Sequence, residues 1–574
     1  MPRSIDRVLP RIAGIAALTA TLFVGLAAGA GTTATSGALP SLVPSPLGHY
    51  LAGRHAQVKR DLEAAADLMS FALAADPGNR QLLEASFNLM LSGGRTKEAL
   101  ALAKRMEETN TLNGVARVAL AVDRVRVGDY KAADHYLDGV SGSGLERFLQ
   151  PMLQSWTQLK LKGRGAAVAA LAPLSQIKGF EPLYEVQYGQ IEDVAGQPAE
   201  AAKHYEKALS MASDQAFRMI ELVANFRVRQ GDRKGAEALY AGFEQAHPRT
   251  FLIEPLRKAM AGGRKPGPLI ATPADGVAEA LFNLAVLLQS EASNEAALVL
   301  ARLALVAHGE DPIYRTLLAD ILDAQGRSAA ALAAYREVPA NSPYGWQAEL
   351  KVAEELQRLD RKDEAIAYLE KLVDTRPDRA EAAIELGDDL RAAKRFAEAA
   401  KAYDKAVARL GTLMPEEWSV YYFRGIAYER SNQWTRAEED FKKALKLQPD
   451  QPYVLNYLGY TWVDRGENLQ QAIGMLKLAV QQKKNDGFIV DSLAWAYYRL
   501  GQYKEAARYQ EQAISLEPAD PVLNDHLGDI YWKLGRRTEA RFQWQRALTF
   551  KPDPDKVAPI EAKLQHGLDK ASGG

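Results

Sequence analysis

One stretch near the C-terminus repeats itself four times and limits the folds that the chain can adopt. The four copies are 418–451, 452–486, 487–520 and 521–554, so three of them have 34 residues and the second has 35. A period of this length is typical of architectures in which each copy is one small helical unit stacked on the next. The 574-residue chain is therefore expected to grow by adding repeats rather than around one large core.

Small residues recur at fixed places in each copy. In the last copy, Gly528 on a first helix lets a second helix approach closely, and Gly535 permits the chain to reverse between the two helices. Ala540 and Ala547 are small enough to pack on the first helix, and Trp544 fills the space beside them. The complete marker set of this copy is Leu527, Gly528, Tyr531, Gly535, Ala540, Trp544, Ala547 and Pro552. This order and spacing resemble the tetratricopeptide repeat.

Weaker copies of the same pattern extend toward the N-terminus, and a stretch rich in Gly and Pro at 262–268 interrupts their phase. The resemblance implies an all-α fold, a right-handed α-solenoid of about 14 tetratricopeptide repeats in two arrays. The expected segments are a signal peptide or signal anchor at 1–30, a flexible tract at 31–45, an N-terminal array at 46–250, a linker at 251–277, a C-terminal array at 278–554, and a capping helix with a tail at 555–574.

The first thirty residues predict export from the cytoplasm. Arg3, Arg7 and Arg11 precede an uncharged apolar run at 12–28, and small residues at 28–30 resemble a cleavage site. A periplasmic location is expected, and the alternative is an uncleaved anchor in the inner membrane that faces the periplasm. The chain has no cysteine, so neither a disulfide nor a lipid attached through a lipobox cysteine is expected.

The sequence contains no recognisable catalytic constellation. Its eight histidines are scattered without an HExxH motif, and no G-x-S-x-G elbow is present. Adjacent carboxylates such as Glu438 and Glu439 fall on predicted solvent faces. The net charge of -1 does not favour a broad grip on nucleic acid. We therefore expect no enzyme activity, no cofactor, no metal and no nucleic-acid partner, and we expect proteins or peptides as partners.

The C-terminal copies predict a binding groove. Positions 2, 5, 9 and 12 of each first helix form a second face, away from the packing stripe. That face mixes aromatic rings with carboxylates and an amide, a combination suited to an extended peptide, and residues 418–550 hold almost half of the chain's aromatic residues. The candidate groove residues are Tyr422, Glu429, Tyr453, Asn456, Tyr460, Phe488, Asp491, Trp495, Tyr498, Asp525, Asp529 and Trp532.

Two interpretations of these side chains remain open from the sequence. Tyr422 and Tyr453 fit interhelical packing as well as a groove, whereas Trp495, Tyr498 and Trp532 favour a groove. His526 is expected to be an ordinary interhelical residue. Because the candidate set includes three aspartates, the groove is expected to prefer basic or neutral segments.

Three short segments resemble a narrower group. Residues 458–461, 491–501 and 526–532 are similar to the closing repeats of bacterial cell-envelope tetratricopeptide proteins, among them a lipoprotein adaptor of a periplasmic carboxy-terminal processing protease. The resemblance covers about a hundred residues and implies a scaffold that presents cell-wall hydrolases to the protease. That adaptor is lipidated and this chain has no cysteine, so it departs from the pattern. The alternative is a scaffold for envelope polysaccharide or cell-wall assembly, with rings that stack on sugars.

Overall fold

The computed structural model describes residues 45–140, 144–211, 216–263, 265–309, 311–411 and 413–568. Within these ranges all regular secondary structure is helical, which confirms the predicted all-α class. The α-helices follow one another as fourteen pairs, while α13 and α30 have no partner in this order. The expected signal segment at 1–30 and nearly all of the tract at 31–45 lie outside the described residues.

The first compact unit ends at Arg361. Its helices are α1 (Pro46–Val58), α2 (Leu62–Ala75), α3 (Arg80–Gly93), α4 (Thr96–Glu108), α5 (Gly114–Arg126), α6 (Tyr130–Asp138), α7 (Glu146–Lys162), α8 (Arg164–Leu171), the 3-10 helix η2 (Ala172–Gln176), α9 (Glu181–Val194), α10 (Pro198–Met211), α11 (Phe217–Arg229), α12 (Arg233–Ala246), α13 (Ile253–Ala261), α14 (Pro273–Ser290), α15 (Asn294–Ala307), α16 (Pro312–Ala324), α17 (Ser328–Arg336) and α18 (Gly345–Arg358).

The second compact unit begins at Lys362. Its helices are α19 (Lys362–Thr375), α20 (Glu381–Ala392), α21 (Phe396–Arg409), the 3-10 helix η3 (Pro415–Glu417), α22 (Trp418–Arg430), α23 (Trp434–Leu447), α24 (Pro452–Arg465), α25 (Leu469–Gln482), α26 (Gly487–Arg499), α27 (Tyr503–Leu516), α28 (Pro521–Lys533), α29 (Arg537–Thr549) and α30 (Pro554–His566).

The last repeat shows why each pair of helices closes as it does. A Cβ added to Gly528 of α28 would lie 2.4 Å from the Trp544 ring of α29, so only glycine permits this approach. Gly535 adopts a left-handed φ of 80° at the reversal between the helices. Ala540 and Ala547 are fully buried beside Trp544. The structural roles predicted for these five residues are confirmed.

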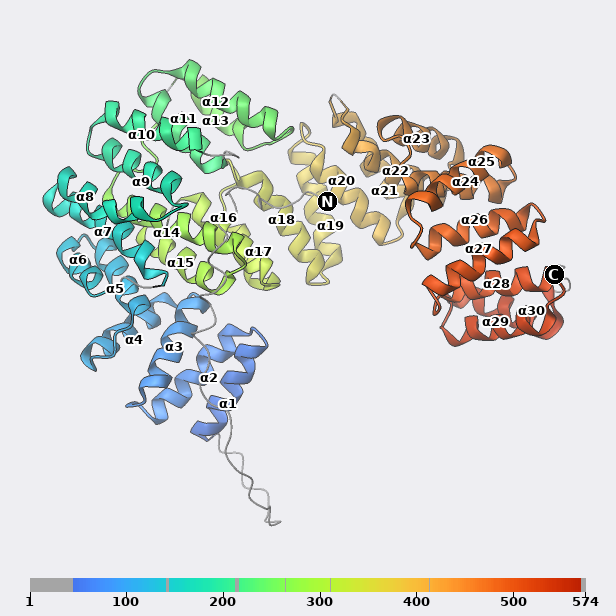
Figure 1. Cartoon of the computed structure of the whole chain (residues 1–574), viewed down its shortest axis with the longest axis horizontal. Coiled ribbons are helices and arrows are strands. Elements are labelled where there is room, and N and C mark those ends of the chain that lie inside the picture. Colours follow the sequence, from blue (N-terminus) through green and yellow to red (C-terminus); the bar gives the residue numbers. More distant parts are fainter. Residues whose placement is uncertain are drawn as a thin grey trace, which may run out of the picture. The chain divides into compact units, whose positions relative to one another are not determined.

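Helices α14 and α15 pack against helices from much earlier in the chain. Helix α14 contacts α5, α7 and α9, and α15 contacts α3 and α5; Figure 1 shows both helices among these earlier ones, within the first unit. The ring of Trp156 in α7 lies where Gly276 of α14 leaves room, because a Cβ there would be 2.2 Å from the ring. The helices that α14 and α15 contact are α3, α5, α7 and α9, and each is the first helix of its pair. In this unit, later helices of the same chain therefore pack on first helices.

A buried ion cluster joins the same two parts of the first unit. The Arg218 guanidinium of α11 pairs with Glu221 at 2.8 Å, with Glu279 of α14 at 2.8 Å and with Asp311 before α16 at 3.1 Å. The Tyr344 hydroxyl donates a hydrogen bond of 2.8 Å to Glu221, and burial raises the pKa of that carboxyl. One buried arginine therefore holds three carboxylates from three separate segments.

The structure divides the chain differently from the predicted segments. The predicted linker at 251–277 contains α13 and the start of α14, where Thr272 and Asp275 form a capping box. The boundary between the two compact units falls between residues 361 and 362 of the chain, so α14–α18 group with the earlier helices. The repeat period continues through α14–α18, but the contacts of α14 and α15 with much earlier helices place these helices in the first unit.

Candidate protein-binding site

The candidate groove residues belong to the first helices of the last four repeats, α22, α24, α26 and α28, in the second unit. Tyr453 and Phe488 are exposed, with 42% and 54% of their surfaces accessible, whereas Asp491 and Asp529 are buried. The half-buried members of the set are Tyr422, Glu429, Asn456, Tyr460, Trp495, Tyr498, Asp525 and Trp532. The set therefore divides into residues available to a partner and residues with internal contacts.

Asp491 and two of the predicted groove rings form one internal cluster with His526. Asp491 accepts one hydrogen bond of 2.6 Å from Gln510 Nε2 and pairs with His526 Nδ1 at 2.8 Å. The His526 ring stacks on Trp495 with centroids 4.1 Å apart, and Trp495 stacks on Tyr498 at 4.6 Å. Burial opposes protonation of His526, but the Asp491 carboxylate outweighs it and raises the histidine pKa above its ordinary value.

The C-terminal helix α30 neutralises the acidic end of the candidate set. Its Lys563 ammonium lies 2.9 Å from Asp525 and 2.8 Å from Asp529, and Trp544 Nε1 also donates to Asp529 at 2.9 Å. Trp532 lies against Gly567, where a Cβ would be 2.1 Å from the ring. These aspartates are engaged inside the unit, which removes the reason for expecting a groove that prefers basic segments.

Helices α22 and α24 hold a second internal cluster. The Tyr457 hydroxyl donates a hydrogen bond of 3.0 Å to Glu429, and its ring is 6.0 Å from that of Tyr422 in a T-shaped arrangement. Burial raises the pKa of both Tyr422 and Tyr460 to about 12. Tyr457 was not among the candidate residues, because it falls one position beyond the fifth. Packing is therefore the observed role of the Tyr422 ring.

An exposed apolar row follows the starts of three successive first helices. We use "apolar row" for Tyr453, Phe488 and Val522, the second residues of α24, α26 and α28. Val522 is 47% exposed and was missed from the sequence, although its repeat position identifies it. Each backbone N–H of the row donates to the capping side chain two residues earlier, at 2.8–3.2 Å. The caps thus fix the backbone that presents these side chains.

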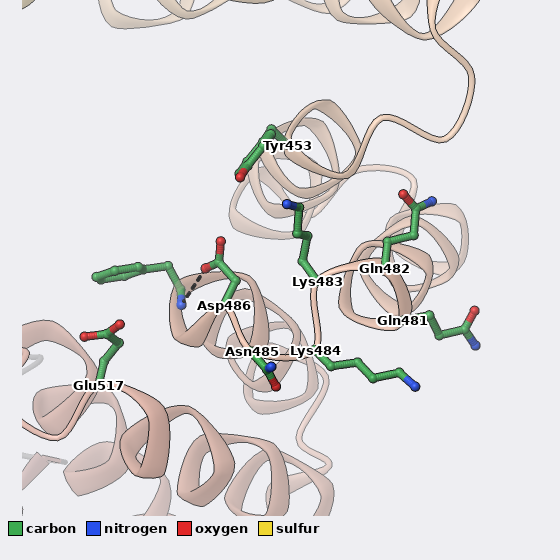
Figure 2. A pocket seen from close by; sticks show the side chains of 9 residues that line it. Tyr453, Gln481, Gln482, Lys483, Lys484, Asn485, Asp486 and Glu517 are labelled. Carbon is green, nitrogen blue, oxygen red and sulfur yellow. Dashed lines mark hydrogen bonds between the residues drawn. The ribbon is translucent and has the colours of Figure 1, made fainter. Parts of the chain in front are cut away.

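A hollow of about 770 Å³ adjoins the first two members of the apolar row. Figure 2 shows Lys483 directed toward Tyr453 and Glu517 on another side of the hollow; the Lys483 ammonium is 5.5 Å from the centre of the tyrosine ring. The hollow is lined by Tyr453, Gln481, Gln482, Lys483, Lys484, Asn485, Asp486, Phe488 and Glu517. Two aromatic rings with amide and charged neighbours suit the side chains and backbone of a peptide better than a buried cofactor.

The described residues hold neither a metal-binding cluster nor a membrane-spanning helix. No group of three or more His, Cys, Asp or Glu side chains among them is arranged to hold a metal ion. No helix among them combines the length and the apolar character needed to cross a bilayer. Stacked helix pairs with an exposed apolar row define the second unit as a helical-repeat module.

Comparison with known proteins identifies the repeats. Models of the family described as "Tetratricopeptide repeat" match residues 350–415, 418–451, 491–520 and 523–554. A TPR repeat-containing protein of Pseudomonas aeruginosa is 28% identical over 209 residues, which are 35% of this chain and 33% of that protein. Human tetratricopeptide repeat protein 13 is 32% identical over 133 residues, 23% of this chain and 15% of that protein. The aligned parts thus span a third or less of these relatives.

Two solved structures with a likeness to this chain share low sequence identity with it. The Cut9–Hcn1 hetero-tetramer of APC/C shares 17% identity with a TM-score of 0.38, covering 91% of this chain and 96% of that one. YrrB, described as a TPR protein with an unusual peptide-binding site, shares 20% identity with a TM-score of 0.27, covering 34% and 97%. The family matches show that the stretches matched between residues 350 and 554 are tetratricopeptide repeats, and such repeats generally mediate protein–protein interaction.

Proposed function

We propose that the chain is a non-enzymatic scaffold whose second unit binds an extended segment of a partner protein along the apolar row. The observation that supports the proposal is the row itself: three large apolar side chains stay exposed at the same repeat position, beside a hollow. Exposed apolar side chains that gather at one place often mark interaction sites. The neighbouring amides of Gln481, Gln482 and Asn485 can hydrogen-bond to a peptide backbone.

The spacing of the row suggests the pattern of the bound segment. Helices α24 and α26 are in contact, as are α26 and α28, and packed helices lie about 8–10 Å apart. A polyproline II helix rises about 3.1 Å per residue and has three residues per turn, so one turn of about three residues would span one repeat. A segment with an apolar residue at every third position would therefore place one side chain against each member of the row.

Charge near the hollow favours a neutral or acidic segment. Lys483 and Lys484 line the hollow, Asp486 is occupied in capping α26, and Glu517 lies on another side. The three aspartates of the candidate set are paired with His526 and Lys563. An acidic group at one end of the segment would meet a lysine rather than an unpaired carboxylate.

A peptide-display selection on the full chain would test this proposal. Peptides selected on the wild type should share apolar residues three positions apart, and Tyr453→Ser/Phe488→Ser should lower their affinity at least tenfold, measured by fluorescence anisotropy. The control is Phe542→Ser, whose ring is 59% exposed on the second helix α29. Equal affinity for all three proteins, with helical circular dichroism preserved, would remove the apolar row from the binding site.

We further propose that the scaffold acts in the bacterial cell envelope. The basic and apolar pattern at 1–28 supports export, and the resemblance of 458–461, 491–501 and 526–532 to envelope adaptors supports the presentation of cell-wall hydrolases to a processing protease. Fractionation of cells that express the tagged full chain would check the location. Cross-linking that returns a protease together with hydrolases would support the adaptor role, whereas enrichment on glycan resin would favour polysaccharide assembly.

A further inference from the structure

Two arginines in the first unit have no hydrogen-bonding or ionic partner among the described residues. Arg302 is on α15, and Arg327 directly precedes α17. The Nε atom of Arg302 and an Nη atom of Arg327 are buried without a hydrogen-bond partner. Both residues as a whole are half-buried. Unpaired guanidinium nitrogens out of contact with water are unfavourable, because desolvation weakens a charge that nothing compensates.

The two positive charges lie close enough to act on each other. Burial, and next the charge of Arg327, lower the pKa of Arg302 to about 10. Burial also lowers the pKa of Arg327. Arginines with a carboxylate partner show the opposite direction elsewhere in this chain: the pKa of Arg95, which pairs with Asp67, is raised. The pair at 302 and 327 therefore lacks the counter-charge that other arginines of this protein have.

The end of α3 lies close to the Arg302 guanidinium. Gly94 ends α3 with a left-handed φ of 86°, and a Cβ there would lie 2.8 Å from the guanidinium carbon of Arg302. A third arginine approaches from the turn after α1, where Arg60 donates a hydrogen bond of 3.3 Å to the carbonyl of Gln325. Three basic side chains thus gather where α3 and the α1–α2 turn meet α15 and the α16–α17 turn.

The carboxylates that act electrostatically on this pair have other partners. Asp61 acts on Arg327, but its Oδ1 caps α2 by accepting from the N–H of Ala64 at 3.1 Å. Glu337 acts on Arg302, but it forms its ion pair with Arg315. Neither carboxylate is hydrogen-bonded to Arg302 or Arg327. Neither guanidinium group therefore has a carboxylate of its own to compensate its charge.

We propose that Arg302 and Arg327 form a binding site for a small oxyanion, a phosphate, sulfate or carboxylate group. The planar guanidinium fork matches two oxygens of such a group, and hydrogen bonds between ionised groups are stronger than neutral ones. A bound oxyanion accepts hydrogen bonds from the unpaired guanidinium nitrogens. Its negative charge offsets the repulsion between the two positive charges. It also ties the end of α3 to α15 and the α16–α17 turn, and so stabilises the packing of the later helices on the earlier ones.

Calorimetric titration of the full chain with sodium phosphate, sulfate and acetate, against chloride at equal ionic strength, tests the site. Wild type is expected to bind at least one oxyanion, and Arg302→Met and Arg327→Met are expected to bind it at least tenfold more weakly. The matched control is Arg80→Met, because Arg80 is exposed at the start of α3. Preference for phosphate or sulfate indicates a phosphate-type ligand, and preference for acetate indicates a carboxylate.

Hydrogen exchange adds a readout that is independent of the calorimetry. The bound oxyanion should slow exchange at the end of α3 and in α15 in wild type, with no such effect in the methionine variants. If the methionine variants fail to fold, Arg302→Lys keeps the charge but loses the fork, and it should bind at least threefold more weakly than wild type. Wild type that binds none of the three oxyanions, or folded variants that bind as tightly as wild type, would overturn the proposal.

Discussion

Replacing Arg218 by methionine should destabilise the first unit more than any substitution of an exposed arginine. The guanidinium makes three ion pairs of 2.8, 2.8 and 3.1 Å, and the side chains of Arg218, Glu221 and Glu279 are at most 7% exposed. Each charge-assisted hydrogen bond contributes about 1.5–3 kcal/mol. Asp311 keeps 17% exposure and the carboxylates can take up protons, which offsets part of the loss. We therefore expect a cost of about 3–5 kcal/mol, the range for breaking a buried ion pair.

Urea denaturation of the full chain, combined with hydrogen exchange resolved to individual helices, would measure this effect. Exchange in α14 and α16 should accelerate in Arg218→Met, because Glu279 and Asp311 are left without their counter-charge. The control is Arg95→Met, whose pairs with Asp67 and Glu98 are about half exposed and should contribute about 0–1 kcal/mol. A loss below about 1 kcal/mol in Arg218→Met, or unchanged protection of α14, would refute the reasoning.

Three further changes test other contacts. Gly276→Ala should cost about 3 kcal/mol or more, because its Cβ would overlap the Trp156 ring; thermal unfolding that matches wild type would contradict this. The fold raises the pKa of His526 above its ordinary 6.5 beside Asp491, so the protonated histidine stabilises the second unit. This contribution should be complete below pH 6.5 and should be lost as the pH rises through the raised pKa. His526→Gln should flatten this pH dependence in urea melts. Lys563→Ala should speed hydrogen exchange in α30, because two partly or fully buried carboxylates lose their ammonium.

The pairing of helices within each repeat was predictable because its determinants are local. Gly528 and Trp544 are sixteen positions apart, and the same offset recurs at Gly425 and Phe441 and at Gly387 and Tyr403, where each glycine leaves room for the ring. A contact that repeats at a constant offset leaves a periodic pattern in the sequence. The helix pairs and the roles of their small residues follow from that pattern alone.

Contacts that occur once leave no such pattern. Arg218 and Glu279 are 61 positions apart, and Trp156 and Gly276, which also approach each other, are 120 positions apart. The helix containing Lys563 was expected as a cap, but its apolar spacing did not indicate that the lysine would meet Asp525 and Asp529. Sequence reasoning therefore placed the candidate residues on one face of the first helices, but it could not tell that Asp491, Asp525 and Asp529 were already paired.

The two units use the first helices of their repeats in different ways. In the first unit α3, α5, α7 and α9 are contacted by α14 or α15 of the same chain, and a buried arginine cluster and a ring seated on a glycine hold that packing. In the second unit the starts of α24, α26 and α28 present the apolar row to solvent. A face that is covered by its own chain can accept a partner only after that packing is lost, and losing it costs free energy. Binding on the proposed apolar row of the second unit carries no such cost. Variants that loosen α14, such as Gly276→Ala, should therefore leave the affinity of row-binding peptides unchanged.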